Sequence, residues 1–432
     1  MSEPEEPPVF DPQNTWSTNF TMMVRIRGSF SDEQLRLALA RVRAGHPALL
    51  QRQREDGRIE PLSLQEAPEF PLDVRTGCSE RDWIDVARAE LQEKFSPEGP
   101  LARFVLLRFA DGADLVAVFH HWVSEGMSGI YVIRDTLRLL GDPAAEMPPA
   151  PMPPNLFSLV PKTVTQDLRT RLGVWREINE LRLTLFRKNL KKGKQARPVF
   201  SEQELALKRD VCFLPATLSV EQTSALLARC RAEHTSVHAA VCVAWLRAYA
   251  GMLEGRKSWV RTASSPVSVR NRLTEPIPET CGGYVCIVET SVDCAPARDF
   301  WEVAREFKRR LTEGSMDHRL FVQELTMSKI ETSFPQSQLF DAFSTYFSGA
   351  EYDFSITNLG QVAIPTVAGP LTVEAFHGPL VNSMENERTV GVSTFAGRLS
   401  FALLFRRSMM DPAWAAQLLE RAVASLDGAV VA

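Results

Sequence analysis

The 432-residue sequence has no long apolar run and no sign of a leader at its start. No window comes near the ~18 uninterrupted apolar residues of a membrane-spanning helix. Residues 1–8 are acidic and rich in proline, whereas a secretory signal needs a basic start followed by an apolar run. We therefore expect a soluble, cytoplasmic chain without a transmembrane segment.

Cysteine is scarce and irregularly placed. The seven cysteines are an odd number, and none of them forms a Cys-x-x-Cys pair. Cys212, Cys230 and Cys242 lie among apolar neighbours, where a free cysteine behaves as a small buried hydrophobe. This pattern predicts neither a disulfide framework nor a zinc site, and it agrees with a reducing compartment.

Positive charge is not in surplus either, since the formal net charge is −4. Nucleic-acid binders usually carry a concentrated basic excess, so we expect no nucleic-acid partner. Apolar residues make up 44% and charged residues 24% of the chain, which is the composition of a globular protein. The length favours two units of about 200 residues each.

The first part of the chain predicts an α/β unit. Residues 20–27 alternate like a half-buried strand, and Ser31 with Gln34 resembles a capping box at a helix start. Two apolar runs, 101–109 and 115–121, are joined by a short Asp-Gly turn and predict a β-hairpin. Further amphipathic segments predict helices over residues 81–94 and 129–140.

A proline-rich stretch then separates two halves. Six prolines crowd into residues 141–154, a composition that holds neither helix nor sheet. The apolar stripe that follows predicts one long amphipathic helix ending in a basic tract over 187–197, and it consists of Leu168, Leu172, Trp175, Ile178, Leu181 and Leu185. We assign 1–142 to an N-terminal unit, 143–205 to this linker, helix and tract, and 206–432 to a C-terminal unit.

The C-terminal unit again reads as strands with covering helices, which makes the whole chain α/β. Helical spacing recurs over residues 219–231, 236–250, 297–311 and 412–426. Strand patterns occupy residues 259–268, 283–290 and most of the stretch after Asp353.

Chemistry is concentrated in residues 120–126, His-His-Trp-Val-Ser-Glu-Gly, at the end of an apolar strand. Side chains alternate along a strand, so His120 and His121 point to opposite faces and do not share one metal ion. A pair of ordinary core or surface histidines is the plainest interpretation of the dipeptide. Active sites, however, are often built where a strand passes into a loop, and Glu125-Gly126 let the backbone turn sharply there.

This segment resembles the signature His-His-x-x-x-Asp-Gly of the condensation-domain and polyketide-associated acyltransferase family. The resemblance extends along the chain, because further blocks typical of that family stand in the family's order. They are residues 43–50 (Arg-Ala-Gly-His-Pro-Ala-Leu-Leu), 235–240 (Thr-Ser-Val-His-Ala-Ala), 266–272 with 282–285, and 353–360 (Asp-Phe-Ser-Ile-Thr-Asn-Leu-Gly).

The resemblance implies a pseudo-dimer of two chloramphenicol acetyltransferase-like subdomains, with mixed sheets covered by helices and a central tunnel. His121 matches the histidine that acts as general base, and an imidazole with a pKa near ~6.5 suits that task at neutral pH. The family's acidic residue pairs with an arginine of the second half. Here that residue is Glu125, followed by Gly126, and we expect Arg270 as its partner, with Arg272 as the second choice.

Three further residues are candidates for the surroundings of the substrate. Ser124 suggests a nucleophile, but the Gly-x-Ser-x-Gly pattern of hydrolases is absent. Asn358 either donates a hydrogen bond to the reacting carbonyl or only shapes a turn. His377 is expected in a loop that reaches the tunnel. No metal site is predicted.

The family implies a free-standing acyltransferase that moves an acyl group from a thioester to an alcohol or amine in natural-product or lipid biosynthesis. The donor is a phosphopantetheine thioester, on an acyl carrier protein or as acyl-CoA, with no permanently bound cofactor. We expect a monomer. The alternatives are an inactive, carrier-binding docking module and a cyclisation or dehydration domain. The basic tract fits a solvated connector, an acidic carrier protein or an anionic membrane surface.

Overall fold

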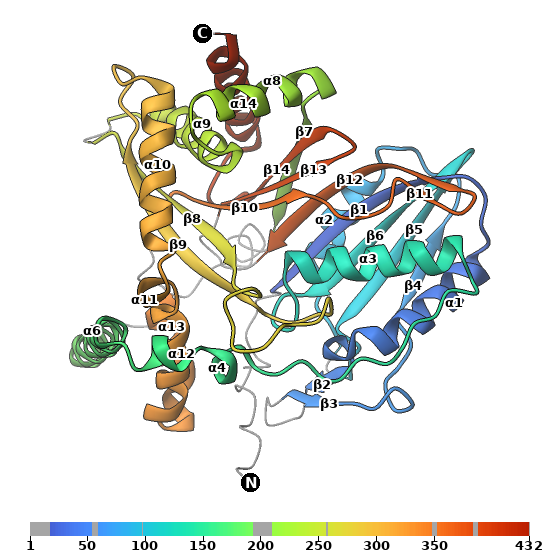
Figure 1. Cartoon of the computed structure of the whole chain (residues 1–432), viewed down its shortest axis with the longest axis horizontal. Helices are drawn as coiled ribbons and strands as arrows, with labels where there is room; N and C mark the ends of the chain where they lie inside the picture. The colour runs from blue at the N-terminus through green and yellow to red at the C-terminus, as the bar shows by residue number, and fades with distance from the viewer. Residues whose placement is uncertain are drawn as a thin grey trace.

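The computed structural model describes residues 18–53, 59–96, 98–192, 210–255, 258–347, 352–382 and 388–431. Two six-stranded sheets lie side by side, and helices cover both of them (Figure 1). Both sheets mix parallel and antiparallel neighbours. The predicted α/β class with mixed, helix-covered sheets is therefore confirmed.

The first sheet has the strand order β11-β12-β1-β6-β5-β4. Its strands are β1 (Asn19–Arg27), β4 (Leu72–Arg75), β5 (Ala102–Phe109), β6 (Gly112–His120), β11 (Val367–Ala368) and β12 (Leu371–Asn382). The predicted hairpin is the pair β5–β6, which is antiparallel throughout. A small separate sheet pairs β2 (Gln51–Gln53) with β3 (Ile59–Pro61).

Helices cover both faces of this first sheet, so β1 is buried on both sides, and the expectation of a half-buried strand was wrong. Phe20 and Met22 point into the core beneath α1 (Asp32–Val42) and α3 (Gly126–Gly141), while Met23 points into the core beneath α2 (Trp83–Gln92). The capping box at the start of α1 is present, since Ser31 Oγ accepts from the Gln34 N–H at 3.1 Å and Gln34 Oε1 accepts from the Ser31 N–H at 2.7 Å.

The second sheet has the order β7-β14-β13-β10-β8-β9. Its strands are β7 (Val211–Thr217), β8 (Val260–Ser268), β9 (Val285–Asp293), β10 (Phe354–Gln361), β13 (Thr389–Phe395) and β14 (Arg398–Arg406). Its helices are α8 (Val220–Ala232), α9 (Val237–Met252), α10 (Phe300–Gly314) and α14 (Pro412–Val431). The apolar helix α9 is buried between α10 and α14 and packs on the sheet (Figure 1).

The chain crosses back from the second half into the first sheet. Strand β12 pairs with β1 over its whole length, for example Asn382 with Asn19 and Thr372 with Arg27. Residues 367–382 were assigned by sequence to the C-terminal unit 206–432, but their strands complete the N-terminal sheet. Their pattern resembles that of any buried strand, so only the pairing reveals the crossover.

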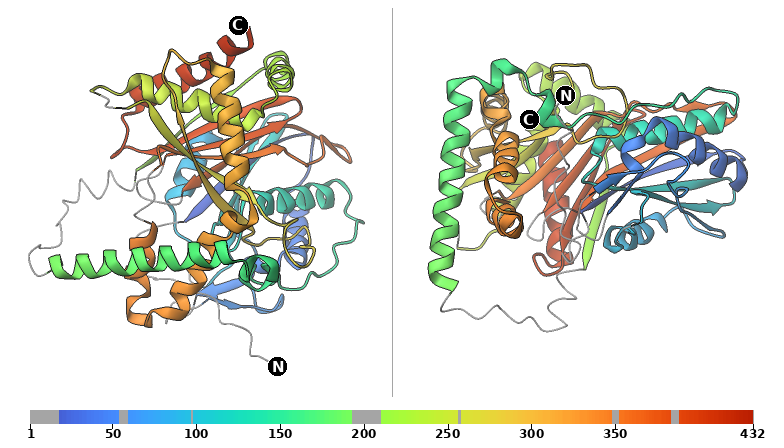
Figure 2. Two further views of the ribbon diagram at one scale, coloured as in Figure 1. Left: turned by 60° about the vertical axis from the view of Figure 1, so that its left-hand side comes forward. Right: turned by 90° about the horizontal axis from the view of Figure 1, so that it is seen from below.

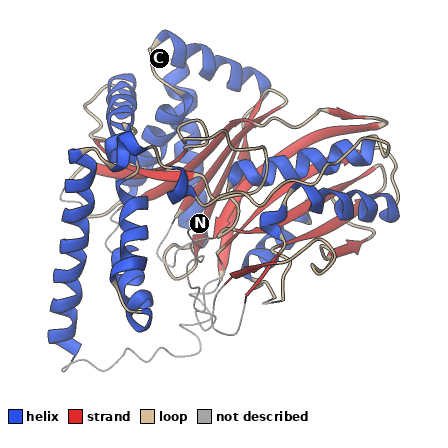
Figure 3. Ribbon diagram, turned by 60° about the horizontal axis from the view of Figure 1, so that its bottom comes forward, coloured by secondary structure: helices blue, strands red, loops and turns tan. Residues whose placement is uncertain are grey.

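A third group of helices lies outside both sheets (Figures 2 and 3). They are α4 (Leu156–Leu159), α5 (Lys162–Thr165), α6 (Leu168–Lys192), α11 (Asp317–Leu320), α12 (Val322–Ser333) and α13 (Gln336–Phe347). The long helix predicted after the linker is α6, whereas α11 to α13 were not predicted. Among the described residues, no helix is long and apolar enough to cross a membrane.

The predicted apolar stripe of α6 divides between two sides of the helix. Ile178 and Leu181 are buried against α12 and α13, but Leu168, Leu172 and Trp175 are exposed. The long helix is present as predicted, but the residues of the stripe do not share one environment. A second apolar face exists on this helix, and periodicity alone could not tell which of the two meets the protein.

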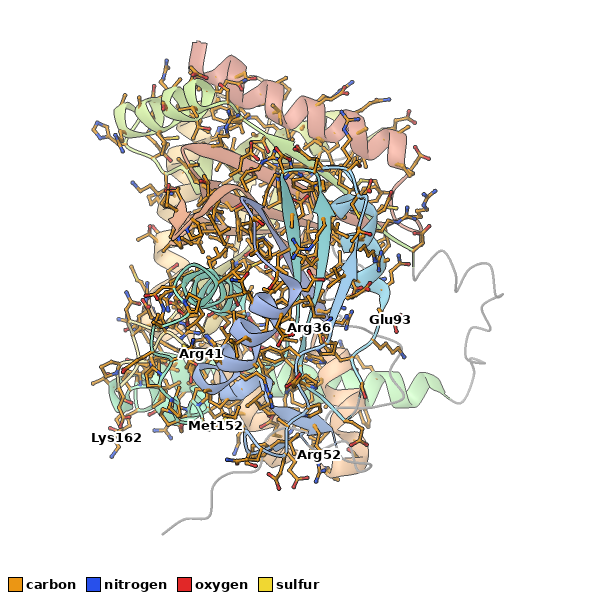
Figure 4. All side chains as sticks on the ribbon, turned by 90° about the vertical axis from the view of Figure 1, so that its right-hand side faces the viewer. Arg36, Arg41, Arg52, Glu93, Met152 and Lys162 are labelled. Carbon is orange, nitrogen blue, oxygen red and sulfur yellow. The ribbon has the colours of Figure 1, made fainter. Side chains whose placement is uncertain are left out.

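The proline-rich linker lies along the first unit. Arg41 on α1 (labelled in Figure 4) donates hydrogen bonds to the carbonyls of Pro143 and Ala145, and the Ala150 N–H donates to Ala44 at 2.8 Å. Residues 193–197 of the predicted basic tract and the acidic residues 1–8 lie outside the described part of the chain.

Candidate active site

The loop after β6 carries the predicted catalytic histidine. Strand β6 ends at His120, and the His121 N–H still donates to the Thr18 carbonyl at 2.8 Å. The next residues fold back on the strand end, because the Ser124 hydroxyl donates to the His120 carbonyl at 2.7 Å. Helix α3 then begins at Gly126. The loop is therefore short and fixed at both of its ends.

The His121 imidazole is held in one orientation. Its Nδ1 lies 3.1 Å from the Ser124 carbonyl oxygen, and its ring meets the Phe20 ring edge-on at a centroid distance of 5.3 Å. A carbonyl only accepts hydrogen bonds, so this contact assigns the proton of the neutral ring to Nδ1. Nε2 then carries the lone pair, as a general base requires. The partner that fixes the tautomer is thus a backbone carbonyl within the motif itself.

His120 lies in a different environment. The Trp122 N–H donates to its Nδ1 at 3.2 Å, and its ring packs against Phe95 at 5.5 Å. Burial, together with the nearby His121 and Arg103, lowers the pKa of His120 to about 4. The ring is therefore neutral at pH 7 and serves the loop as a hydrogen-bond acceptor.

Ser124 serves the loop through both of its oxygens. Its side chain is fully buried, its hydroxyl proton points to the His120 carbonyl, and its own carbonyl receives His121 Nδ1. A nucleophilic serine needs a base at its hydroxyl, whereas here the imidazole contacts the carbonyl oxygen instead. The geometry therefore gives Ser124 a positioning role.

Glu125 joins the two halves of the molecule. Its side chain is 6% exposed, and it accepts from Arg270 Nη2 at 2.9 Å and from Arg270 Nε at 3.1 Å. The other carboxylate oxygen caps α3 by accepting the Met127 N–H at 2.7 Å. The ion pair expected from the sequence is thus present, and the longer glutamate reaches both partners at once.

Arg270 is itself held by several groups of the second half. It donates to the carbonyls of Pro278 and Thr280, each at 3.0 Å, and its guanidinium lies 4.8 Å from the centre of the Tyr284 ring. These contacts satisfy the donors that Glu125 leaves free. Arg272, the second choice, points elsewhere and bonds Ser315 and Asp317.

Two residues that sequence reasoning did not single out complete this junction. The Ser128 hydroxyl on α3 donates to the Gly282 carbonyl at 3.1 Å and accepts the Gly282 N–H at 3.2 Å. The Thr280 hydroxyl donates to the Gly45 carbonyl at 2.7 Å. Gly45 and Gly282 lie in two of the blocks that resemble the family. Those blocks could therefore have pointed to Ser128 and Thr280 as their contacts.

Gly126 is needed for space rather than for a sharp turn. It begins α3, and a Cβ placed there would lie 2.5 Å from Leu359 Cδ2. Gly126 is not among the described glycines with a positive φ, so the sharp turn expected here does not depend on it; its close neighbour is the end of a side chain in the block 353–360. Within that block, Asn358 Oδ1 accepts the Gly360 N–H at 2.8 Å, and Gly360 has a φ of +65°. Asn358 thus has a structural contact, but it supports an irregularity within β10 rather than the turn after a strand that the second interpretation expected.

His377 does not lie in a loop. It stands within β12, opposite Met23 of β1, and stacks on Trp83 at a centroid distance of 4.9 Å. Burial and the nearby Arg25 lower the pKa of His377 to about 4. The strand was missed because Gly378 and Pro379 follow at once, and both residues usually interrupt strands.

Two other residue classes bear on the chemistry of the site. All seven cysteines are free thiols, and six of them are buried. Within the described ranges, no group of three His, Cys, Asp or Glu side chains is placed to hold a metal ion.

Comparison with known proteins gives one family match, over part of the second half of the chain. Residues 213–404 match a family described as the phthiocerol/phthiodiolone dimycocerosyl transferase C-terminus. No curated protein matches the chain in sequence.

Three solved structures share the fold of nearly the whole chain at low sequence identity. SgcC5 from Streptomyces globisporus has 18% identity and a TM-score of 0.64, covering 100% of this chain and 96% of its own. Polyketide synthase associated protein 5 from Mycobacterium tuberculosis has 16% identity and a TM-score of 0.63, covering 95% and 94%. The first condensation domain of the calcium-dependent antibiotic synthetase has 17% identity and a TM-score of 0.65, covering 97% and 92%.

The match and the three structures agree on one assignment. Residues 213–404 match the phthiocerol/phthiodiolone dimycocerosyl transferase C-terminal family, and the chain has the two-subdomain, chloramphenicol acetyltransferase-like fold seen in condensation domains.

Proposed function

We propose that this protein is an acyltransferase that moves an acyl group from a thioester to an alcohol, forming an ester, or to an amine, forming an amide. His121 is the general base. The observation that carries the proposal is the contact of His121 Nδ1 with the Ser124 carbonyl, because it leaves Nε2 as the basic nitrogen of a fixed imidazole. The family match and the condensation-type fold support a transferase of this class.

The reaction balances with this one base. Nε2 takes the proton of the acceptor as its oxygen or nitrogen attacks the thioester carbonyl, and a new C–O or C–N bond forms. The tetrahedral intermediate collapses with cleavage of the C–S bond. The thiolate then takes the proton back from the imidazolium, which restores neutral His121.

Donor and acceptor are inferred from chemistry and from relatives. A thioester on phosphopantetheine, carried by CoA or by an acyl carrier protein, is the donor that a condensation-type fold accepts. We place it in a tunnel between the two halves, next to His121. SgcC5 was solved with a naphthyl-ethanediol, and a bound diol favours an alcohol acceptor.

A docking module without turnover is the second candidate. It is favoured by Glu125, which stands where the family signature has aspartate. Glu125 nevertheless reaches both Arg270 and the Met127 N–H, so the loop keeps its anchor. We therefore favour the enzyme.

The test measures thiol release and product mass with acyl-CoA and acylated carrier protein donors, each offered panels of alcohols and amines. We expect release that depends on the acceptor, and we expect His121→Ala to lower the rate by about 10²–10⁴-fold. His234→Asn, at an exposed position in the turn between α8 and α9, is the matched control and should keep full activity. Equal, slow release by native protein and His121→Ala with every acceptor would refute the assignment. Carrier binding without release would favour the docking module.

A further inference from the structure

Helix α6 has two apolar faces, and only one of them meets the rest of the protein. Ile178 and Leu181 pack against Ile330 of α12 and Leu339 of α13. Five other large apolar side chains are exposed: Leu168 (67%), Leu172 (55%), Trp175 (66%), Leu183 (47%) and Phe186 (61%). At 100° per residue all five fall within one sector about 80° wide. We call this set the outer stripe.

The outer stripe is bordered by positive charge on both sides. At the same helical spacing, exposed Arg169, Arg176 and Arg187 lie along one border, and exposed Arg171 and Arg182 lie along the other. From Arg169 to Lys192 the sequence holds eight basic and two acidic residues, a surplus of six positive charges in a chain of net charge −4. This segment is therefore strongly basic, whereas the chain as a whole is slightly acidic.

A concave site continues the basic border onto the neighbouring helices. It lies between α6 and the segment α11–α12, and its lining includes Arg169, Arg176, His318 and Arg319. The acidic residue of this lining, Glu177, accepts the Tyr346 hydroxyl at 2.5 Å. Arg176 donates to Glu180 at 3.1 Å, so the site offers chiefly the guanidinium groups of Arg169 and Arg319 to an anion beside the outer stripe.

We propose that α6 is a peripheral docking surface for an anionic lipid bilayer. The outer stripe enters the boundary between headgroups and acyl chains, the bordering arginines pair with lipid phosphates, and the concave site holds one headgroup. A helix that lies in the plane of a bilayer has this composition, with Trp, Phe and Leu on one face and basic residues beside them. Helix α6 lies at the edge of the molecule, where a flat surface can reach it (Figure 2).

The basic borders of the outer stripe make a second copy of this chain an unfavourable partner for it. Pairing two outer stripes would bring basic borders against basic borders in either orientation, and like charges in contact destabilise such a pair. An acidic carrier protein would satisfy the charge. It offers no counterpart, however, for an exposed stripe that continues through five turns of helix, whereas a bilayer does.

The test is co-sedimentation of the full chain with vesicles of phosphatidylglycerol mixed with phosphatidylcholine, compared with phosphatidylcholine alone. We expect binding only to the anionic vesicles, and weaker binding as salt is added. Leu172→Glu should lower the vesicle affinity by about tenfold or more. Leu37→Glu is the matched control, because Leu37 on α1 is equally exposed (54%) and should bind like the native chain.

Trp175 provides an independent readout. Native protein should show a blue-shifted emission on anionic vesicles, and Trp175→Phe should bind nearly as well while losing most of that shift. The proposal is overturned if the native chain does not sediment with anionic vesicles, or if Leu172→Glu and Leu37→Glu bind alike. Binding to a carrier protein, or self-association, that Leu172→Glu abolishes without any vesicle binding would overturn it in favour of those partners. None of these measurements depends on thiol release, so they can fail separately from the acyltransferase assignment.

Discussion

Two buried glutamates, in two regions of the molecule, meet opposite surroundings. Glu125 at the junction of the halves lies against Arg270 and caps α3, so its charge is fully paired. Glu324 lies on α12, in the outer group of helices. It is close enough to Cys286 and Tyr346 for its negative charge to raise the pKa of both groups. Burial raises the pKa of Glu324 to about 8, and no described cation opposes that shift.

The contrast shows where this fold tolerates charge. At the junction, an ionised carboxylate is useful because it ties the His121 loop to the second half of the chain. In the outer helical layer, the same residue type is accommodated mainly as a neutral acid. The junction should therefore be sensitive to the loss of a partner, and the outer layer should be sensitive to pH.

The largest effect is expected from Glu125→Ala. This change leaves the Arg270 guanidinium buried beside an empty position and removes the cap of α3, so it should lower the free energy of unfolding by about 3–5 kcal/mol. Denaturant titration measures it. Asp317→Ala breaks the exposed pair with Arg272 and should cost less than about 1 kcal/mol. Equal losses of unfolding free energy in the two variants would mean that the buried Glu125–Arg270 pair stabilises the protein no more than an exposed ion pair does.

The second prediction concerns Glu324→Gln and pH. Because the pKa of Glu324 is raised from 4.5 to about 8 in the folded state, the contribution of the protonated group is complete below pH 4.5 and is lost as pH rises toward 8. The slope is about 1.4 kcal/mol per pH unit, or about 3 kcal/mol between pH 5 and 7. Relative to the native chain, Glu324→Gln should gain that stability over this interval, measured by unfolding at each pH. A constant difference would show that the group ionises normally.

The smallest effect is expected from Gly126→Ala. The added Cβ would lie 2.5 Å from Leu359 Cδ2, the end of a half-buried side chain that can shift, so we expect a loss of about 1 kcal/mol. Combining it with Leu359→Ala should recover part of that loss, because the blocking group is gone. Gly428→Ala in α14 has open space around its Cβ and should be neutral or stabilising by up to about 1 kcal/mol. Thermal unfolding compares them, and a loss at Gly428 equal to that at Gly126 would exclude the steric explanation.

Local signals in the sequence predicted most of the elements. The hairpin β5–β6 and the capping box of α1 follow from residues that are neighbours in the chain. The partner of Glu125 was also predictable, because a buried carboxylate needs an arginine and the family blocks offered two.

Features that depend on distant contacts were not predictable. Which apolar face of α6 is covered depends on α12 and α13, whose residues lie far along the chain. His377 was expected in a loop, because the strand around it is specified by β1 rather than by its own sequence. The hydrogen-bond partner of His121 is a backbone carbonyl, which no residue type reveals.

The crossover of β12 has a consequence for synthesis. Arg27 and Glu374 form an ion pair across β1 and β12, although 347 residues separate them in the chain. During translation, β1 is synthesised first, and its neighbour β12 is synthesised only near the end of the chain. The N-terminal sheet must therefore keep one β1 edge open until late, and such a non-local pairing makes folding slow. A ribosome-bound N-terminal half should thus be the stage at which chaperones hold this protein.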